Sequence, residues 1–192
     1  MVGLSGVLGG GGLPETMAAR TRWGDDEVTT THTDDHVDLA VSSHSLLVDD
    51  PPAAVDDGDT LLWLWGEVYG HGSGRGYEPR PGGPETSAAY CAELYREHGL
   101  SFVEELNGQF ALVVYDRPNR ELSFVTDRLA THPIYRARLS GDEFVFASNP
   151  QWLALHDAID VEFDRSYLHE YLALRRVFGR EPPLVGVREL PP

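Results

Sequence analysis

Two consecutive β-hairpins in the second half of the chain constrain its fold more than any other feature. Residues 109–127 contain the apolar runs QFALVVYD and ELSFVTD joined by the turn RPNR, and residues 134–148 contain IYRARL and EFVFAS joined by SGD. Short runs rich in β-branched and aromatic residues, separated by turn residues, are typical of paired antiparallel strands. The two hairpins therefore predict an antiparallel sheet.

Helical patterns are confined to other parts of the chain. The clearest is TSAAYCAELYREHG (86–99), which Thr86 or Ser87 can cap and Gly99 can end. One face of this helix would carry Ala88, Cys91, Leu94 and Tyr95. A short helix is expected to begin near Pro14. Another is expected to run from a cap at Asp164 to Gly179, with helical spacing of Leu168, Tyr171, Leu172 and Arg175.

Apolar runs predict further strands at 2–8, 37–42 and 60–65, and a polar turn with an edge strand at 24–36. Strands and helices segregate along the chain instead of alternating. This arrangement favours an α+β fold over a doubly wound parallel sheet. The glycine-rich segment GHGSGRG (70–76) lacks the Gly-Lys-Ser/Thr of a phosphate-binding loop and predicts a flexible turn.

The charge of the chain limits its partners and its environment. Acidic residues outnumber basic ones 31 to 15, lysine is absent, and the net charge is -16. Such a chain repels itself at ordinary ionic strength, whereas the Debye length falls to about 3 Å near 1 M salt. The composition predicts an acidic, halophilic protein. It argues against binding to nucleic acid or to anionic membranes, because no basic stripe is present.

Cysteine usage and hydropathy indicate the compartment. Cys91 is the single cysteine, so an intrachain disulfide is impossible, and the chain reads as an intracellular protein. A run of about 18 apolar residues, which a membrane span requires, does not occur. The opening MVGLSGVLGGGG lacks the basic segment of a secretory signal. These features predict a cytoplasmic protein.

Five motifs occur in one order along the chain: WGEVYGH (65–71), LNGQFALVVYD (106–116), TDRLATHPIY (126–135), FAS (146–148) and VGVRELPP (185–192). In order and spacing they resemble the N-terminal glutaminase domain of asparagine synthetases, which are class II glutamine amidotransferases. The resemblance covers nearly the whole chain. It implies the four-layer sandwich of N-terminal-nucleophile hydrolases, with two antiparallel sheets between helical layers. It also implies a glutaminase-like domain at 1–180 and an extended tail at 181–192 leading toward a synthetase domain.

The resemblance assigns catalysis to positions that this sequence has changed. The family uses a cysteine after the initiator methionine as nucleophile, with its own α-amine as base. Here that position holds Val2, which has neither thiol nor hydroxyl. The resemblance matches the family's oxyanion-binding asparagine and glycine to Trp65 and Gly66. The indole of Trp65 is therefore expected to fill the place of an amide donor.

The substrate-binding positions have changed as well. The arginine that holds the α-carboxylate of glutamine corresponds to Ser43 or His44, and the aspartate that holds its α-amine corresponds to Ser87. Neither substitute carries the needed charge at neutral pH. The predicted function is therefore a catalytically silent domain, structural or regulatory for an ATP-dependent amide-forming partner. The related whole proteins are glutamine-dependent ligases of asparagine biosynthesis.

Two other functions stay open on the sequence. One is an active amidohydrolase with a repositioned nucleophile, such as Ser5 after removal of the first four residues. The other is a sensor that binds a different small molecule in the changed pocket. Cys91 lies on the apolar face of a predicted helix and is expected to be a buried thiol.

The remaining polar clusters are expected to be structural. His32 and His36, with Asp34, Asp35 and Asp38, have poor spacing for a metal site on a strand and predict an acidic loop. Asp127, Arg128 and Tyr135 belong to a motif that is architectural in the family. No cofactor is expected in this chain, and ATP and magnesium are implied for a synthetase domain alone. The expected partners are that domain, in the same or a separate chain, and a second copy of this chain.

Overall fold

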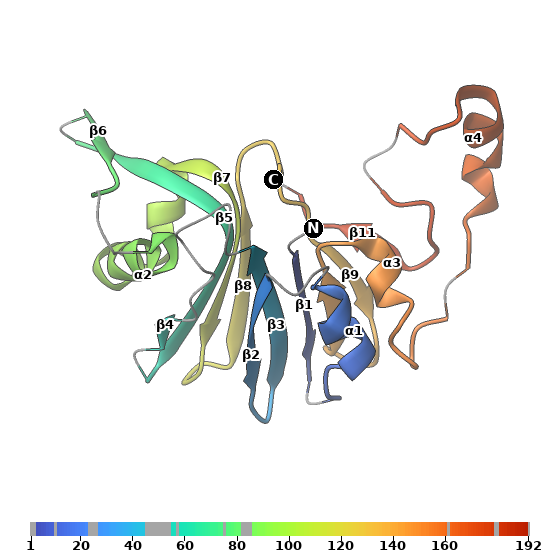
Figure 1. The fold of residues 1–192 in the computed structure, drawn as a ribbon, viewed down its shortest axis with the longest axis horizontal. Helices are drawn as coiled ribbons and strands as arrows, with labels where there is room; N and C mark the ends of the chain where they lie inside the picture. Colours follow the sequence, from blue (N-terminus) through green and yellow to red (C-terminus); the bar gives the residue numbers. More distant parts are fainter. Residues whose placement is uncertain are drawn as a thin grey trace.

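The computed structural model describes residues 3–9, 11–22, 27–44, 55–56, 58–74, 76–81, 86–160, 162–178 and 181–191. Two antiparallel sheets pack face to face, and helices cover their outer faces (Figure 1). Helix α2 lies outside one sheet, and α1 and α3 lie outside the other. The predicted α+β class, with two antiparallel sheets, is confirmed.

The larger sheet has six strands in the order β11-β9-β10-β1-β3-β2. Strand β1 lies near its centre and is hydrogen-bonded to β10 on one side and to β3 on the other. Strand β2 is an edge strand, as predicted. The bounds are β1 (Gly3–Leu8), β2 (Glu27–Thr33), β3 (Val37–His44), β9 (Tyr135–Arg138), β10 (Phe144–Ala147) and β11 (Val187–Glu189).

The smaller sheet has the order β4-β5-β7-β8, and β6 pairs with the far end of β5. Its bounds are β4 (Val55–Asp56), β5 (Thr60–Ser73), β6 (Gly76–Pro79), β7 (Leu106–Asp116) and β8 (Glu121–Thr126). The predicted strand at 60–65 is thus much longer than expected. Residues 70–73 of the glycine-rich segment continue β5 instead of forming a turn, because they pair with β6 and β7.

The helices are short, and none in the described part of the chain is long and apolar enough to cross a membrane. The α-helices are α1 (Glu15–Arg20), α2 (Ser87–His98), α3 (Pro150–Leu153) and α4 (Leu168–Leu174), and the 3₁₀ helices are η1 (Gly99–Glu105) and η2 (Arg165–Tyr167). The expected cap of α2 is confirmed, because the side chain of Thr86 accepts a hydrogen bond from Ala89 N. Gly99 ends the helix in a left-handed conformation with φ 59°.

Alternation along the strands divides the core into layers. Leu61 and Trp63 of β5 point between the sheets, whereas Leu62 and Leu64 point toward α2. The first part of β5 and most of β7 are buried on both faces, which explains why these strands read as continuous apolar runs. A third cluster packs the six-stranded sheet against α1 and α3 through Val7, Met17, Ala137, Val145, Ala147, Trp152, Leu153 and Val187.

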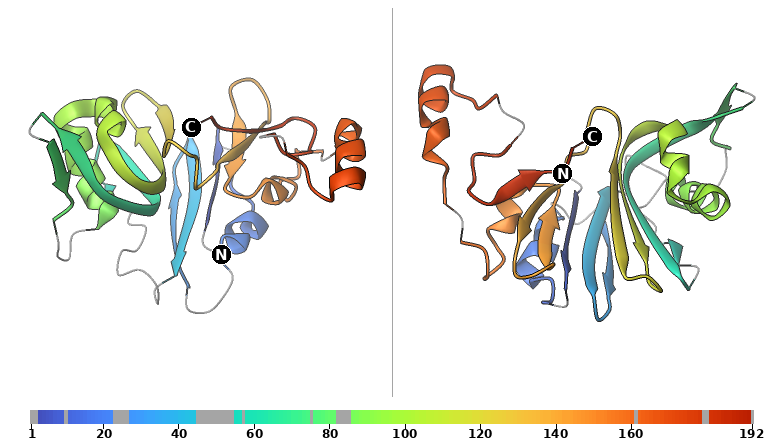
Figure 2. Two further views of the ribbon diagram at one scale, coloured as in Figure 1. Left: turned by 90° about the horizontal axis from the view of Figure 1, so that it is seen from above. Right: turned by 180° about the vertical axis from the view of Figure 1, so that it is seen from behind.

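The two predicted hairpins are present but do not share a sheet. The hairpin β7–β8 belongs to the five-stranded sheet, and β9–β10 belongs to the six-stranded one. The segment between them, residues 127–134, carries the chain from one sheet to the other (Figure 2). This segment makes up most of the TDRLATHPIY motif (126–135), so the motif forms a crossing between the layers.

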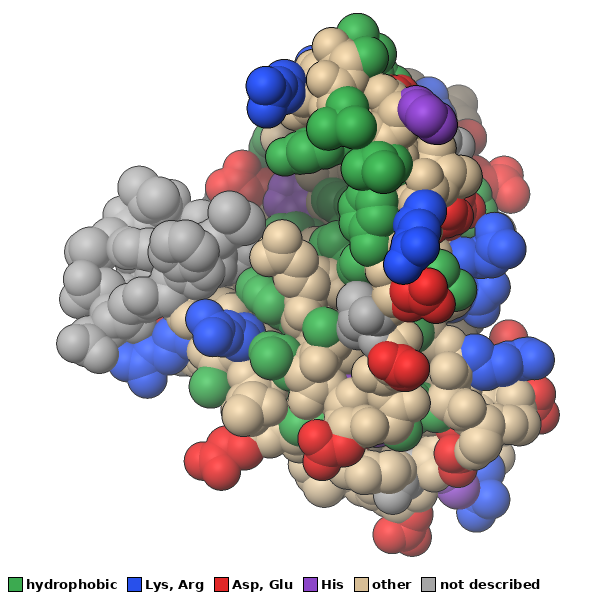
Figure 3. All heavy atoms as spheres, turned by 90° about the vertical axis from the view of Figure 1, so that its right-hand side faces the viewer, with side chains coloured by type: hydrophobic (Ala, Val, Ile, Leu, Met, Phe, Trp, Pro, Cys, Tyr) green, Lys and Arg blue, Asp and Glu red, His purple; other side chains and the backbone are tan. Residues whose placement is uncertain are grey.

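The helix predicted from Asp164 to Gly179 is shorter than expected. Asp164 caps the first turn as predicted, since its side chain accepts a hydrogen bond from Ser166 N. The helix ends at Leu174, because Arg175 adopts a left-handed conformation with φ 58°. Gly179 lies outside the described residues. Hydrophobic side chains gather in the upper half of the face shown in Figure 3, and those exposed on or beside α4 include Leu168, Tyr171, Leu172, Leu174 and Phe178.

Residues 181–191 return to the sheet. Val187–Glu189 pairs with Tyr135–Ala137 of β9, and Val187 is buried. Within the tail predicted at 181–192, residues 187–189 form a strand that is hydrogen-bonded to the sheet. The division of the chain at residue 180 stays a prediction.

Candidate active site

The first strand positions the start of the chain. Val2 lies outside the described residues, and Gly3 is the first residue of β1. The backbone N–H of Leu4 donates to Ser148 Oγ at 3.1 Å, and Ser148 N–H donates to the carbonyl of Leu4 at 2.9 Å. The serine of the FAS motif therefore holds the beginning of β1 by two reciprocal hydrogen bonds.

Trp65 lies on β5 with its side chain toward the space between the sheets. It packs against the inter-sheet core, and its ring meets the ring of His132 edge to face with centroids 4.4 Å apart. Such aromatic contacts stabilise a pair beyond the area they bury. The indole is thus held by packing, at the position where the motif resemblance predicts an amide side chain.

Gly66 follows in a conformation that other residues rarely adopt, with φ +114°. Its register partner on β7 is Phe110. A Cβ atom added to Gly66 would lie 2.1 Å from the carbonyl oxygen of Gln109, which is far inside van der Waals contact. The close approach of β5 to β7 therefore requires glycine at this position.

Asp127 fixes the crossing segment to β7. Its buried carboxylate accepts hydrogen bonds from the backbone N–H groups of Phe110, Leu129 and Thr131 and from the hydroxyl of Thr131. Burial raises the pKa of Asp127, but these donors outweigh burial and lower the pKa below its ordinary value. The carboxylate of Asp127 is therefore ionised at neutral pH and acts as the acceptor for backbone N–H groups.

His132 stands between Asp127 and Trp65. Burial lowers the pKa of His132, and the neighbouring carboxylate of Asp127 raises it only in part. The ring is accordingly neutral at pH 7, which suits its contact with the indole. The hydroxyl of Thr131 lies 3.3 Å from its Nδ1.

Ser87 is fully buried at the first position of α2. Its hydroxyl accepts a hydrogen bond from Val68 N at 3.4 Å, where the pairing of β5 with β7 shifts register. The neutral hydroxyl thus contacts a backbone irregularity. Ser43 and His44 lie on β3 as register partners of Val28 and Glu27, and their side chains lie outside the described part of the structure.

The two substitute nucleophiles considered from sequence are both buried. Ser5 lies in the middle of β1 between Ala40 and Ala147, and its side chain has no exposed surface. Cys91 is fully buried in the cluster between α2 and the five-stranded sheet. The expectation of a buried thiol is confirmed. Neither side chain faces a place where substrate could reach it.

The remaining motif residues make structural contacts. Arg128 donates to the backbone carbonyl of Glu104 at 3.2 Å. Tyr135 is hydrogen-bonded to Glu189. Burial raises the pKa of Tyr135, and the carboxylate of Glu189 raises it further. The contact of Arg128 joins the crossing segment to η1, and the contact of Tyr135 joins β9 to β11.

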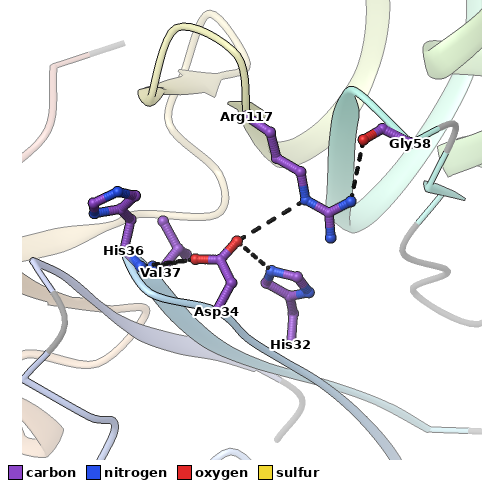
Figure 4. Close-up of polar contacts among 6 residues, drawn as sticks. All are labelled: His32, Asp34, His36, Val37, Gly58 and Arg117. Atoms are coloured by element: carbon purple, nitrogen blue, oxygen red, sulfur yellow. Dashed lines mark hydrogen bonds and ion pairs between the residues drawn. The ribbon is translucent and has the colours of Figure 1, made fainter.

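The His/Asp cluster forms the turn of the β2–β3 hairpin (Figure 4). Asp34 Oδ2 lies 3.0 Å from His32 Nε2, and Asp34 Oδ1 accepts hydrogen bonds from the backbone N–H groups of His36 and Val37. Arg117 Nε, from the β7–β8 turn of the other sheet, lies 4.0 Å from Asp34 Oδ2. Among the described residues no group of three or more His, Cys, Asp or Glu is arranged to hold a metal ion.

Substitution of Asp34 by alanine is expected to lower the free energy of unfolding by about 1–2 kcal/mol, because two hairpin N–H groups lose their acceptor. Burial raises the pKa of Asp34, while His32 and the two N–H donors lower it, and the net pKa lies below the ordinary value. The contribution of Asp34 to the free energy of unfolding is thus fully present above the pKa that Asp34 has in the unfolded chain. It is lost as the pH falls through the pKa of Asp34 in the folded protein. Urea unfolding at pH 7 measures it, with Asp35→Ala as control.

Several contacts lacked a signal in the sequence. His71 Nδ1 lies 2.6 Å from Tyr90 Oη, which ties the end of β5 to α2. Arg117 also donates to the carbonyl of Gly58 at 3.2 Å. These partners are far apart in sequence. For the contact of Trp65 with His132, the sequence offered one indirect indication: both residues lie within recognised motifs.

Comparison with known proteins agrees with this architecture. A family model described as "Glutamine amidotransferase domain" matches residues 15–192. The asparagine synthetase [glutamine-hydrolyzing] of Sandersonia aurantiaca is 30% identical over 110 residues, which cover 53% of this chain and 21% of that protein. Two proteins of Bacillus subtilis (strain 168) also match. Asparagine synthetase [glutamine-hydrolyzing] 2 is 26% identical over 114 residues, and asparagine synthetase [glutamine-hydrolyzing] 3 is 30% identical over 129.

These matches span between 15% and 21% of the length of the three relatives and between 53% and 65% of this chain. The family match begins after β1, so the correspondence of Val2 rests on the motif resemblance alone. From α1 onward the match includes every strand of both sheets except β1, and so includes the tail strand. The chain belongs to the glutamine amidotransferase family, as a domain related to those of asparagine synthetases.

Proposed function

We propose that this chain is a catalytically silent glutamine-amidotransferase-like domain that supports an ATP-dependent amide-forming partner. The observation that carries the proposal is Trp65, whose indole is packed against His132 and the inter-sheet core. An oxyanion-binding site needs a donor aimed at the reacting oxygen, and loss of one donor reduces the rate by about 10²–10³-fold. At this position an indole in a packed environment replaces the amide.

The missing charges support the same proposal. Glutamine presents a carboxylate and an ammonium group, and each needs a group of opposite charge in a selective site. Ser87 offers a neutral hydroxyl that already contacts Val68 N. Val2 supplies no nucleophile. The partner would then form its amide bond with free ammonia or another amine.

The active-enzyme alternative needs Ser5 at a new N-terminus, and the pairing of β1 argues against this change. Exposure of Ser5 as an N-terminus would remove Gly3 and Leu4, which pair with Ser42 and Val41 of β3. Leu4 is also part of the inter-sheet core. The sensor alternative needs space where the indole of Trp65 is packed. Both observations favour the silent domain.

The proposed partner is a synthetase domain, in the same or a separate chain. The exposed hydrophobic side chains on α4 support a contact with another protein surface, because clustered exposed apolar residues mark such contacts. In this proposal ATP and magnesium bind to the partner, and the whole assembly works in a salt-rich cytoplasm.

Glutamate release from glutamine tests the proposal directly. The purified chain, with its N-terminal residue determined by mass spectrometry, is incubated with glutamine in multimolar KCl, and the expected rate equals that of buffer. A second readout is the intact mass after treatment with a diazoketone analogue of glutamine, which alkylates an activated nucleophile. We expect no added mass, since Cys91 is buried and Val2 is inert.

The Bacillus subtilis asparagine synthetase 2, assayed in its own buffer, is the positive control for glutamate detection. Trp65→Asn tests whether the indole alone blocks the site, and we expect this variant to stay inactive because the nucleophile is still missing. Glutamine-dependent glutamate release by the unmodified chain would refute the proposal.

A further inference from the structure

The six-stranded sheet extends beyond the edge of the five-stranded sheet. Phe124 of β8, an edge strand, packs against Phe144 and Phe146 of β10, with ring centroids 5.9 and 4.8 Å apart. Strands β9 and β11 come after β10 in the sheet order, away from its centre. Their inner faces, which continue the face carrying Phe144 and Phe146, therefore lie beside the inter-sheet core.

Three arginines occupy that inner face. Arg136 and Arg138 lie two residues apart on β9, so their side chains share one face, and Ala137 between them packs toward the helical layer. Arg188 of β11 is the register partner of Arg136. Like charges directly opposite each other on neighbouring strands destabilise a sheet unless another group compensates them.

The protein supplies little compensation. Arg188 NH1 lies 3.5 Å from Glu181 Oε1. Within the described residues Arg136 and Arg138 make no ion pair with a carboxylate. Acidic residues are twice as numerous as arginines in this chain, 31 against 15. Two neighbouring arginines without a carboxylate partner are therefore unexpected in a surface of this composition.

The three arginines help to line a hollow. It has a volume of about 400 Å³, and its lining consists of Arg136, Arg138, Asp142, Glu143, Phe144, Gly186 and Arg188. This volume lies within the range of small-molecule sites. Glu143 Oε2 is already hydrogen-bonded to the hydroxyl of Ser140 at 2.6 Å, in the turn between β9 and β10. The three arginines carry three positive charges against the two negative charges of Asp142 and Glu143, so the lining has a net charge of +1 and the guanidinium groups are its anion-binding groups.

We propose that this hollow binds a small polyanion, a molecule with two or more carboxylate or phosphate groups. Guanidinium groups bind both kinds of oxyanion through paired N–H donors, and each such contact is stronger than a neutral hydrogen bond. A ligand with several oxyanions would compensate the opposed charges of Arg136 and Arg188 and reach Arg138. The phenyl ring of Phe144 contributes an apolar wall. The proposal is independent of whether the chain hydrolyses glutamine.

Titration of the full chain with potassium citrate, potassium pyrophosphate and potassium acetate at constant ionic strength tests this site. The readout is the set of arginine Nε–Hε signals in ¹H–¹⁵N spectra, assigned by substitution, together with Kd from calorimetry. We expect citrate, pyrophosphate or both to shift the signals of Arg136, Arg138 and Arg188. Acetate, with one carboxylate, is expected to bind at least tenfold more weakly.

Arg136→Ser is expected to weaken binding about tenfold or more, since it removes a charge-assisted contact. Arg138→Ser provides a second test should the first variant disturb the β9–β11 pairing. Arg20→Ser is the matched control, because Arg20 is an exposed arginine in the last turn of α1. A preference for citrate or pyrophosphate identifies the ligand as a polycarboxylate or a phosphate compound. Absence of binding by both, or equal binding by Arg136→Ser and Arg20→Ser, would overturn the proposal.

Discussion

Replacement of Gly66 by alanine is expected to lower the free energy of unfolding by roughly 3–5 kcal/mol. Two costs combine at this position. The conformation, with φ +114°, is unfavourable for any residue with a Cβ atom. The added Cβ would also meet the carbonyl oxygen of Gln109 at 2.1 Å, and a backbone carbonyl in a central strand has little room to move. Because domains of this size are stable by about 5–15 kcal/mol, this variant is close to unfolding.

Gly76 is a matched control for this substitution. It has the same φ, +114°, in β6, but a Cβ atom there would have open space around it. Gly76→Ala therefore reports the conformational cost alone, which we expect to be about 1–2 kcal/mol. Urea unfolding of both variants at one KCl concentration measures the difference. Equal losses would mean that β5 and β7 separate easily, contrary to the clash argument.

Asp127→Ala is expected to have an effect of similar size, roughly 3–5 kcal/mol, through the loss of hydrogen bonds. The carboxylate accepts from the N–H groups of Phe110, Leu129 and Thr131. Alanine leaves these donors without an acceptor in a buried place. Asp127→Asn keeps one oxygen and should lose about half as much. Asp116→Asn is the control, because Asp116 serves an exposed turn at Asn119, and we expect a loss below about 1 kcal/mol.

The dependence of this effect on pH follows from the direction of the shift. The folded pKa of Asp127 is lower than that of an ordinary aspartate. Its contribution is therefore fully present above the unfolded pKa of about 3.9 and is lost as pH falls through the folded pKa. Acid unfolding of the native protein should thus be steeper below about pH 4 than that of Asp127→Asn. Parallel acid curves for the two proteins would contradict this assignment.

Local features of the fold could be predicted from the sequence, whereas the pairing of strands that lie far apart in the sequence could not. Thr86, Gly99 and Asp164 act within one helical turn, so their roles as helix ends follow from nearby residues. The two hairpins also form locally. Their division between two sheets depends on the pairing of β7 with β5 and of β10 with β1, which joins residues far apart in sequence. No local pattern encodes that choice.

The same limit applies to the site. The sequence predicts that Trp65 and Ser87 depart from the family pattern. It could not indicate that Trp65 would pack on His132 or that Ser87 would contact Val68 N, because both contacts depend on the tertiary fold. The end of helix α4 was predicted wrongly, at Gly179 instead of Leu174, for a different reason. A left-handed arginine is uncommon, and the glycine at position 179 gave a stronger signal.

The pairing of β11 with β9 affects how the protein is made. Strand β9 depends on Val187–Glu189 to cover its outer backbone groups. During synthesis on the ribosome, β9 and β10 emerge well before those three residues, so this edge of the sheet stays open for the interval between them. An open edge is a template for pairing with another chain. The nascent protein is thus open to aggregation at this edge until β11 emerges.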